Sequence, residues 1–112
     1  MKPPRNQKEL WVGVAEVRPK DKDNEILKGR KGAFVNFVTW ASSSEEFAFN
    51  IELVARKFGL FVSEIVNPEP VDLRRRRVER FKDETEDMIS RAQEDPNAII
   101  YGTFHTFEKD DA

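Results

Sequence analysis

The 112-residue chain contains no cysteine, a single histidine and no long run of apolar residues. Without cysteine it has no disulfide framework, no thiolate metal site and no cysteine nucleophile. No stretch approaches the roughly 20 consecutive apolar residues that a membrane-spanning helix needs. The opening residues MKPPRNQKEL lack the apolar segment of a secretory signal. These absences favour a cytoplasmic protein that uses neither a cofactor nor a metal and does not enter a membrane.

The chain also has little net charge, −2, although 36% of its residues are charged. The charge is unevenly distributed: residues 1–32 contain nine Lys or Arg against five Asp or Glu, and the remaining residues are acidic on balance. A domain that binds polyanions over its whole surface would be basic overall, so a generic polyanion binder is disfavoured. The length fits one domain over residues 1–112, with a flexible arm at 1–8 and an acidic tail at 108–112.

The alternation of apolar and polar residues predicts six elements in the order ββαβαβ. They are strands over 10–18, 32–41, 60–67 and 98–108, and helices over 44–58 and 72–95. This order predicts an α/β (α+β) two-layer sandwich, in which a four-stranded mixed sheet carries two helices on one face. Right-handed crossovers place both helices on the same side. The general character is ferredoxin-like, but that fold has the order βαββαβ, so the strand order stays open.

Two of these elements have the clearest local signals. Ser43 and Glu46 form a capping box at the start of the first helix, and Gly59 follows its end. Its buried stripe is predicted to contain Phe47, Ile51, Val54 and Phe58. The strand over 32–41 is apolar on both faces, which is typical of a central strand with both sides covered. In the second helix the predicted stripe is Val78, Phe81, Thr85, Met88, Ile89 and Ala92.

Three stretches of the chain, GAFVNFVTWASSSEEF, KFGLFVSEIVNPEPV and YGTFHTF, carry a family resemblance. Together they resemble a group of small bacterial α/β proteins to which no function is assigned. The resemblance extends from about Leu10 to Phe107 and lies in the general pattern rather than in a catalytic signature. It implies a compact α/β domain in a bacterial cytoplasm, and it transfers no functional residue.

Four consecutive arginines, Arg74, Arg75, Arg76 and Arg77, open the predicted second helix. They have two interpretations. On a helix, several acidic residues lie four positions after a basic one, as Glu79 does after Arg75, so the run can be one side of a solvated, salt-bridged helix. Alternatively, positive charge at a helix N-terminus opposes the helix dipole, and a bound anion or nucleic acid would relieve that conflict.

The basic stretch KGRKG, with Lys28, Arg30 and Lys31, is a second candidate for phosphate binding. Its glycines allow backbone N–H groups to approach an anion, although the stretch lacks the spacing of a P-loop or a dinucleotide fingerprint. A plain turn before the next strand is the simpler interpretation. A nucleic-acid or phosphoanion site is best supported if this loop lies beside Arg74–Arg77.

His105 and the strand aromatics are further candidates. Strand alternation predicts that His105 shares a face with Tyr101, Thr103 and Phe107, and Glu16, Glu64 or Glu108 could reach it as partners of a small enzyme's general base. No catalytic or metal-ligand spacing accompanies this histidine, which favours a structural role. The aromatic residues Phe34, Trp40, Tyr101 and Phe107 are either core or a surface on which bases stack.

Phe49 and Leu53 lie one turn apart on the side of the first helix opposite its buried stripe. Either another part of the chain covers them or another molecule does. If both helices cover one sheet face, the other face needs a partner layer. The sequence therefore predicts a non-catalytic, self-associating interaction domain, a homodimer or the partner of another protein. The predicted contacts are Phe49 and Leu53 on the helix, and Trp11, Trp40 and Tyr101 on the sheet.

Overall fold

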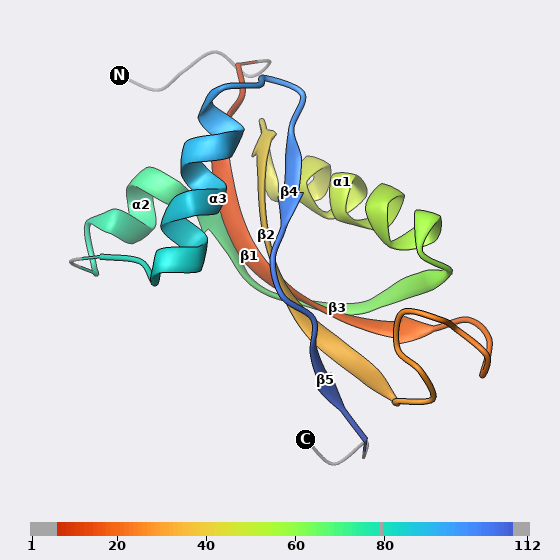
Figure 1. The fold of residues 1–112 in the computed structure, drawn as a ribbon. Coiled ribbons are helices and arrows are strands. Elements are labelled where there is room, and N and C mark those ends of the chain that lie inside the picture. Colours follow the sequence, from red (N-terminus) through yellow and green to blue (C-terminus); the bar gives the residue numbers. More distant parts are fainter. Residues whose placement is uncertain (1–6, 79, 109–112) are drawn as a thin grey trace.

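Two long antiparallel strands form the centre of the structure (Figure 1). The computed structural model describes residues 7–78 and 80–108. Within these residues the sheet contains β1 (Glu9–Pro19), β2 (Gly32–Ala41), β3 (Leu60–Pro70), β4 (Ile99–Tyr101) and β5 (His105–Phe107). β1 pairs with β2 in an unbroken register, from Glu9 opposite Ala41 to Val17 opposite Ala33. β3 pairs with the other side of β1, whereas β4 and β5 both pair with the other side of β2.

The predicted four-stranded mixed sheet is wrong, because the sheet has five strands and every pairing is antiparallel. The strand predicted over 98–108 is interrupted at residues 102–104, and this interruption produces β4 and β5. At the break, the Gly102 N–H donates to the Asn36 carbonyl at 3.0 Å. The strand order β3-β1-β2 also differs from that of ferredoxin-like folds.

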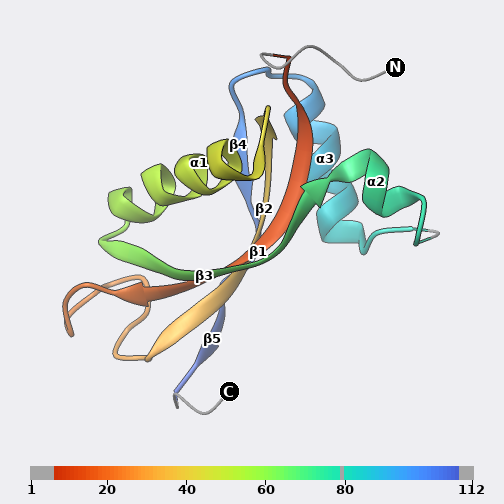
Figure 2. The same cartoon turned by 180° about the vertical axis from the view of Figure 1, so that it is seen from behind.

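The helices cover opposite faces of this sheet (Figures 1 and 2). α1 (Ser44–Lys57) packs on one face, and the short α2 (Val71–Arg75) and α3 (Asp83–Gln93) pack on the other. The predicted two-layer sandwich with both helices on one face is therefore wrong. The handedness rule behind that prediction applies to connections between parallel strands, and the described strands include no parallel pair.

Alternate residues of β2 enter two separate cores, which confirms the prediction of a central strand covered on both sides. Val35 and Phe37 pack beneath α1, whereas Val38 packs beneath α3. The core beneath α1 also contains the predicted helix stripe, with Phe47 and Ile51 fully buried. The core beneath α3 contains Leu10, Val12, Val71, Phe81, Met88, Ile89, Ala92 and Ala98.

The boundaries of α1 follow the predicted capping signals. The Ser43 hydroxyl accepts a hydrogen bond from the Glu46 N–H at 3.2 Å, and the Glu46 carboxylate accepts one from the Ser42 N–H at 2.8 Å. After the helix, Gly59 has a φ of +70°. Glycine adopts this left-handed conformation without the penalty that a Cβ atom brings, so the chain can turn sharply into β3.

The second predicted helix, over 72–95, is wrong as one continuous element, because α2 ends at Arg75 and α3 begins at Asp83. A straight helix of that length would extend about 36 Å, more than either of the two shorter dimensions of the described chain, 28 and 25 Å. The break allows α3 to lie against β2 and β4. Most of the predicted stripe is buried there, but Val78 lies in the connection and is exposed.

The connection between β1 and β2 is tied to the body of the protein by Asn24. Its side-chain amide donates to the carbonyls of Phe58 and Gly59 at 2.7 and 3.2 Å. Its side-chain oxygen accepts from the N–H groups of Ile26 and Leu27 at 2.9 and 3.0 Å. The Leu27 side chain is itself buried beneath α1. The loop therefore has a defined shape.

The chain ends were predicted to form a flexible arm at 1–8 and an acidic tail at 108–112. Residues 1–6 of the arm and 109–112 of the acidic tail lie outside the described residues. The adjoining residues form ion pairs with the body of the protein. The Lys8 Nζ lies 3.8 Å from the Glu46 Oε2, and the Glu108 Oε1 lies 2.6 Å from the Arg30 Nη1.

Replacing Asn24 with alanine should lower the free energy of unfolding by about 2 kcal/mol, because two loop N–H groups and two carbonyls lose their partner. Urea unfolding would measure this change. Asn97→Ala is the matched control, since the Asn97 side chain makes no hydrogen bond to any described residue. Equal stability of the two variants would show that Asn24 does not hold the loop.

Candidate interaction surfaces

The outer face of α1 has an apolar centre between oppositely charged ends. Phe49 is 57% exposed and Leu53 is 38% exposed, so no described segment covers this predicted pair. Glu45 lies in the first turn of the helix, and Arg56 and Lys57 lie in the last. Acidic residues at the start and basic residues at the end also match the helix dipole, so the same charges stabilise the helix.

The three predicted sheet contacts lie in different environments. Trp11 is half-buried against Phe47, with 6.1 Å between ring centroids. The Trp40 indole N–H donates to the carbonyls of Ala92 and Asp95 at the end of α3. Since α3 covers the face that Trp40 occupies, this part of the sheet needs no partner layer. Of the three, only Tyr101 is exposed, with 41% of the residue's surface accessible.

Three of the four arginines form ion pairs with carboxylates of the same chain. Glu69 pairs with both Arg74 and Arg77. Arg74 also donates to the Asn67 carbonyl at 2.6 Å. Arg75 binds Glu86 through two hydrogen bonds of 2.9 and 3.1 Å, a bidentate geometry that is strong for a surface pair. Because the helix is broken after Arg75, Glu86 can approach it from the start of α3. The predicted partner Glu79 lies outside the described residues.

Arg76 is the exception in this run. It is exposed and forms no ion pair with any residue of 7–78 or 80–108. The structure thus places three of the four arginines in ion pairs with two carboxylates, and leaves the Arg76 side chain without an ion pair to a described residue.

The basic loop at 28–32 lies at the opposite end of the molecule from the arginines, as both views of the fold show (Figures 1 and 2). The structure brings it together instead with the end of β1 and the start of β3. These segments line a shallow hollow of about 510 Å³. Its lining contains Arg18, Pro19, Lys20, Asp21, Lys22, Gly29, Arg30, Lys31 and Phe61. Five of these side chains are basic and one is acidic.

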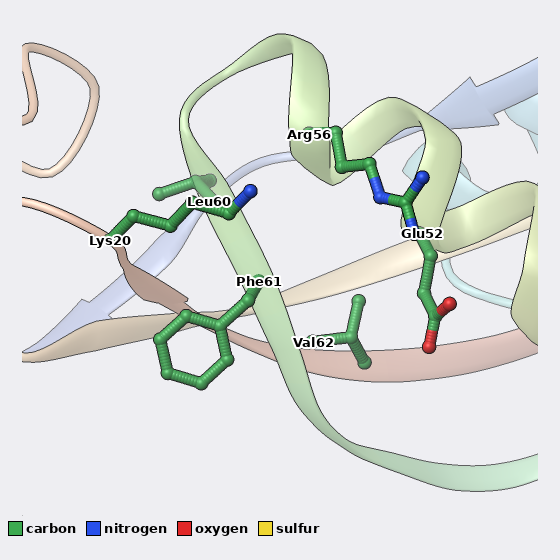
Figure 3. A pocket seen from close by; sticks show the side chains of 6 residues that line it. All are labelled: Lys20, Glu52, Arg56, Leu60, Phe61 and Val62. Carbon is green, nitrogen blue, oxygen red and sulfur yellow. The ribbon is translucent and has the colours of Figure 1, made fainter.

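A second, smaller hollow of about 280 Å³ adjoins the first. Figure 3 shows its lining: Lys20, Glu52 and Arg56 extend around Leu60, Phe61 and Val62 of β3. Lys20 and Phe61 belong to both hollows.

Arg18, Lys20, Lys22 and Phe61 were not identified as site residues from the sequence. The one signal that pointed to three of them was the excess of basic residues in 1–32. Phe61 had no such signal, because it looked like any other residue of an amphipathic strand.

His105 is exposed and forms no ion pair with any described residue, including the acidic residues that were predicted to reach it. Glu16 binds Ser63 and Arg18, and Glu108 binds Arg30. The carboxylate that interacts electrostatically with His105 is that of Glu84. Hydrogen bonds from the hydroxyl and the N–H of Thr103 lower the pKa of Glu84, and the nearby His105 lowers it further.

His105 and Phe107 share a face as predicted, but the prediction is wrong for Tyr101, which lies on the other face. Tyr101 pairs with Phe37 on the α1 face, whereas Phe107 lies 5.3 Å from Phe34 on the other face. The interruption at 102–104 changes the alternation between them. Among residues 7–78 and 80–108, no group of three His, Cys, Asp or Glu side chains could hold a metal ion. None of the described helices is long and apolar enough to cross a membrane.

Comparison of the chain with protein-family models, with curated proteins and with solved structures found no match. The resemblance to small bacterial α/β proteins therefore stays a prediction, and the surfaces themselves must support any assignment of function.

Glu69 makes the acid stability of the arginine segment testable. Desolvation alone would raise the pKa of Glu69, but hydrogen bonds from Arg77 and Arg74, together with their charges, outweigh it and lower the pKa below its ordinary value of 4.5. A carboxylate whose pKa is lowered in the folded state stabilises the protein at pH values above its ordinary pKa. This contribution is lost as the pH falls through the folded-state pKa.

Glu69→Gln should therefore reduce the free energy of unfolding most at neutral pH, and the difference from the unmodified protein should shrink below pH 4.5. Urea unfolding at a series of pH values measures it. Glu64→Gln, at an exposed position on the same strand that forms no ion pair with a described residue, is the matched control. A difference for Glu69→Gln that is constant with pH would contradict the ion-pair origin.

Proposed function

We propose that this chain is a non-catalytic, cytoplasmic protein-interaction domain that self-associates through the outer face of α1. The observation that carries the proposal is the exposure of Phe49 and Leu53 at the middle of a helix whose inner face is fully buried. An exposed Phe such as Phe49, with 57% of its surface accessible, does not stabilise the monomer through that exposed part. Burial of such side chains is the main driving force of association.

The charge distribution supports a second copy of the same chain as the partner. In a dimer with two-fold symmetry, two α1 helices pack antiparallel and the same patch faces itself. With the axis between Phe49 and Leu53, Phe49 of one protomer meets the partner's Leu53. Glu45 at the start of one helix then meets the partner's Lys57 at the end of the other. An unrelated partner would not require acidic, apolar and basic residues to follow one another along α1 in an order that complements itself.

The size of the surface sets the expected strength. α1 has 14 residues, and a contact confined to one such helix per protomer falls at or below the roughly 1,200 Å² of total buried surface that marks stable complexes. The dimer should therefore be weak and should dissociate on dilution through the micromolar range, about −8 kcal/mol of association free energy.

Phe49→Glu should shift the monomer–dimer equilibrium toward monomer by about a hundredfold or more in Kd, because both copies lose an apolar contact and gain a buried charge. Light scattering behind a sizing column, across a range of concentrations, measures the shift. Leu73→Glu is the matched control, since Leu73 is 47% exposed on α2. A monomer at all concentrations for the unmodified protein would refute the proposal.

A charge exchange tests the antiparallel arrangement itself. Glu45→Lys and Lys57→Glu should each weaken the dimer, because each places like charges opposite one another, with an effect of up to about 1 kcal/mol per pair. The double variant restores opposite charges in both symmetric pairs and should recover most of the affinity. Additive weakening in the double variant would exclude this arrangement.

A further inference from the structure

The hollow beside the β1–β2 loop concentrates positive charge on a protein that is negative overall. Lys20, Lys22 and Lys31 are exposed at its rim and form no ion pair with any described residue. Two other basic residues of the lining have acidic partners: Arg30 pairs with Glu108, and Arg18 pairs with Glu16. Three free ammonium groups around one concavity repel each other, and a bound anion would remove that repulsion.

Beside these charges, flat side chains lie in a row across the open part of the sheet. Phe61 of β3 is paired with Arg18 of β1. The Arg18 guanidinium lies 5.3 Å from the centroid of the Phe107 ring, and the Phe107 ring lies 5.3 Å from that of Phe34. No described helix covers this part of the sheet (Figure 2). Aromatic rings and guanidinium planes are the groups on which unpaired bases stack.

The geometry of this region is formed before any ligand arrives. Asn24 holds the loop against the turn after α1, the Lys20 N–H donates to the Gly59 carbonyl, and the Lys31 N–H donates to the Phe107 carbonyl, both at 3.0 Å. Gly32 permits the close approach of Phe107, because a Cβ atom there would lie 2.6 Å from its ring. A preorganised site loses little conformational entropy when a ligand binds.

We infer that this hollow binds a short single-stranded segment of nucleic acid. Lys20, Lys22 and Lys31 contact its phosphates, and Phe61, which is 44% exposed, stacks on one base. The proposed α1 dimer is a separate surface, so this inference does not depend on it. A single strand fits because its bases are free to stack, and a short one fits because the net charge of −2 repels a long polyanion beyond the hollow.

The test is the fluorescence anisotropy of labelled DNA and RNA oligonucleotides of about ten nucleotides. Three phosphate contacts predict that the logarithm of the affinity falls with that of the salt concentration with a slope of about −2. The double variant Lys22→Ala/Lys31→Ala should bind at least about tenfold more weakly, with a slope reduced to about −0.7. Phe61→Leu should weaken binding by about tenfold through lost stacking, with no change of slope.

Arg76→Ala is the matched control, because it removes one free positive charge from the opposite end of the molecule, and it should leave the affinity unchanged. Circular dichroism of each variant confirms that it is folded. The inference is overturned if no oligonucleotide binds at low salt, or if Arg76→Ala weakens binding as much as the lysine variant. It is also overturned if poly-glutamate displaces the oligonucleotide as readily as unlabelled oligonucleotide does, because the hollow would then recognise acidic protein segments.

Discussion

The register between β1 and β2 is the constraint on which the rest of the structure depends. It places alternate side chains of both strands in two different cores, so that α1 and α3 each find an apolar surface on their own side. A shift of one residue would exchange the two faces. The same register sets the position of Thr39, whose buried hydroxyl donates to the Ala98 carbonyl at 2.9 Å and brings β4 against β2.

The sequence predicted α1 and β2 well, because capping residues and apolar periodicity act over a few neighbours. It wrongly predicted both helices on one face of the sheet, since periodicity shows that Phe81 or Met88 is buried without showing what covers it. The break between α2 and α3 and the interruption between β4 and β5 were not predicted, for a related reason. Glu84 accepts hydrogen bonds from Thr103 at the interruption between β4 and β5, and nothing near either residue in the chain predicts that contact.

The candidate sites show the same limit. Arg74–Arg77 is the densest run of positive charge in the sequence. Three of its members nevertheless form ion pairs with Glu69, which precedes the run, or with Glu86, which follows it. The hollow could not be predicted from the sequence, because its basic residues come from separate segments and Phe61 comes from β3, which follows α1. Phe49 and Leu53 could be predicted as exposed, since a helix with one clear inner face identifies its outer face.

β3 forms an outer edge of the sheet, and such edges can add strands from other molecules. The final part of β3 is poorly suited to that pairing. Pro68 and Pro70 have no N–H to donate, and Asn67 departs from an extended backbone with a φ of 51°. This end of the strand therefore resists the edge-to-edge growth that leads to fibrillar aggregates, even when the protein is concentrated.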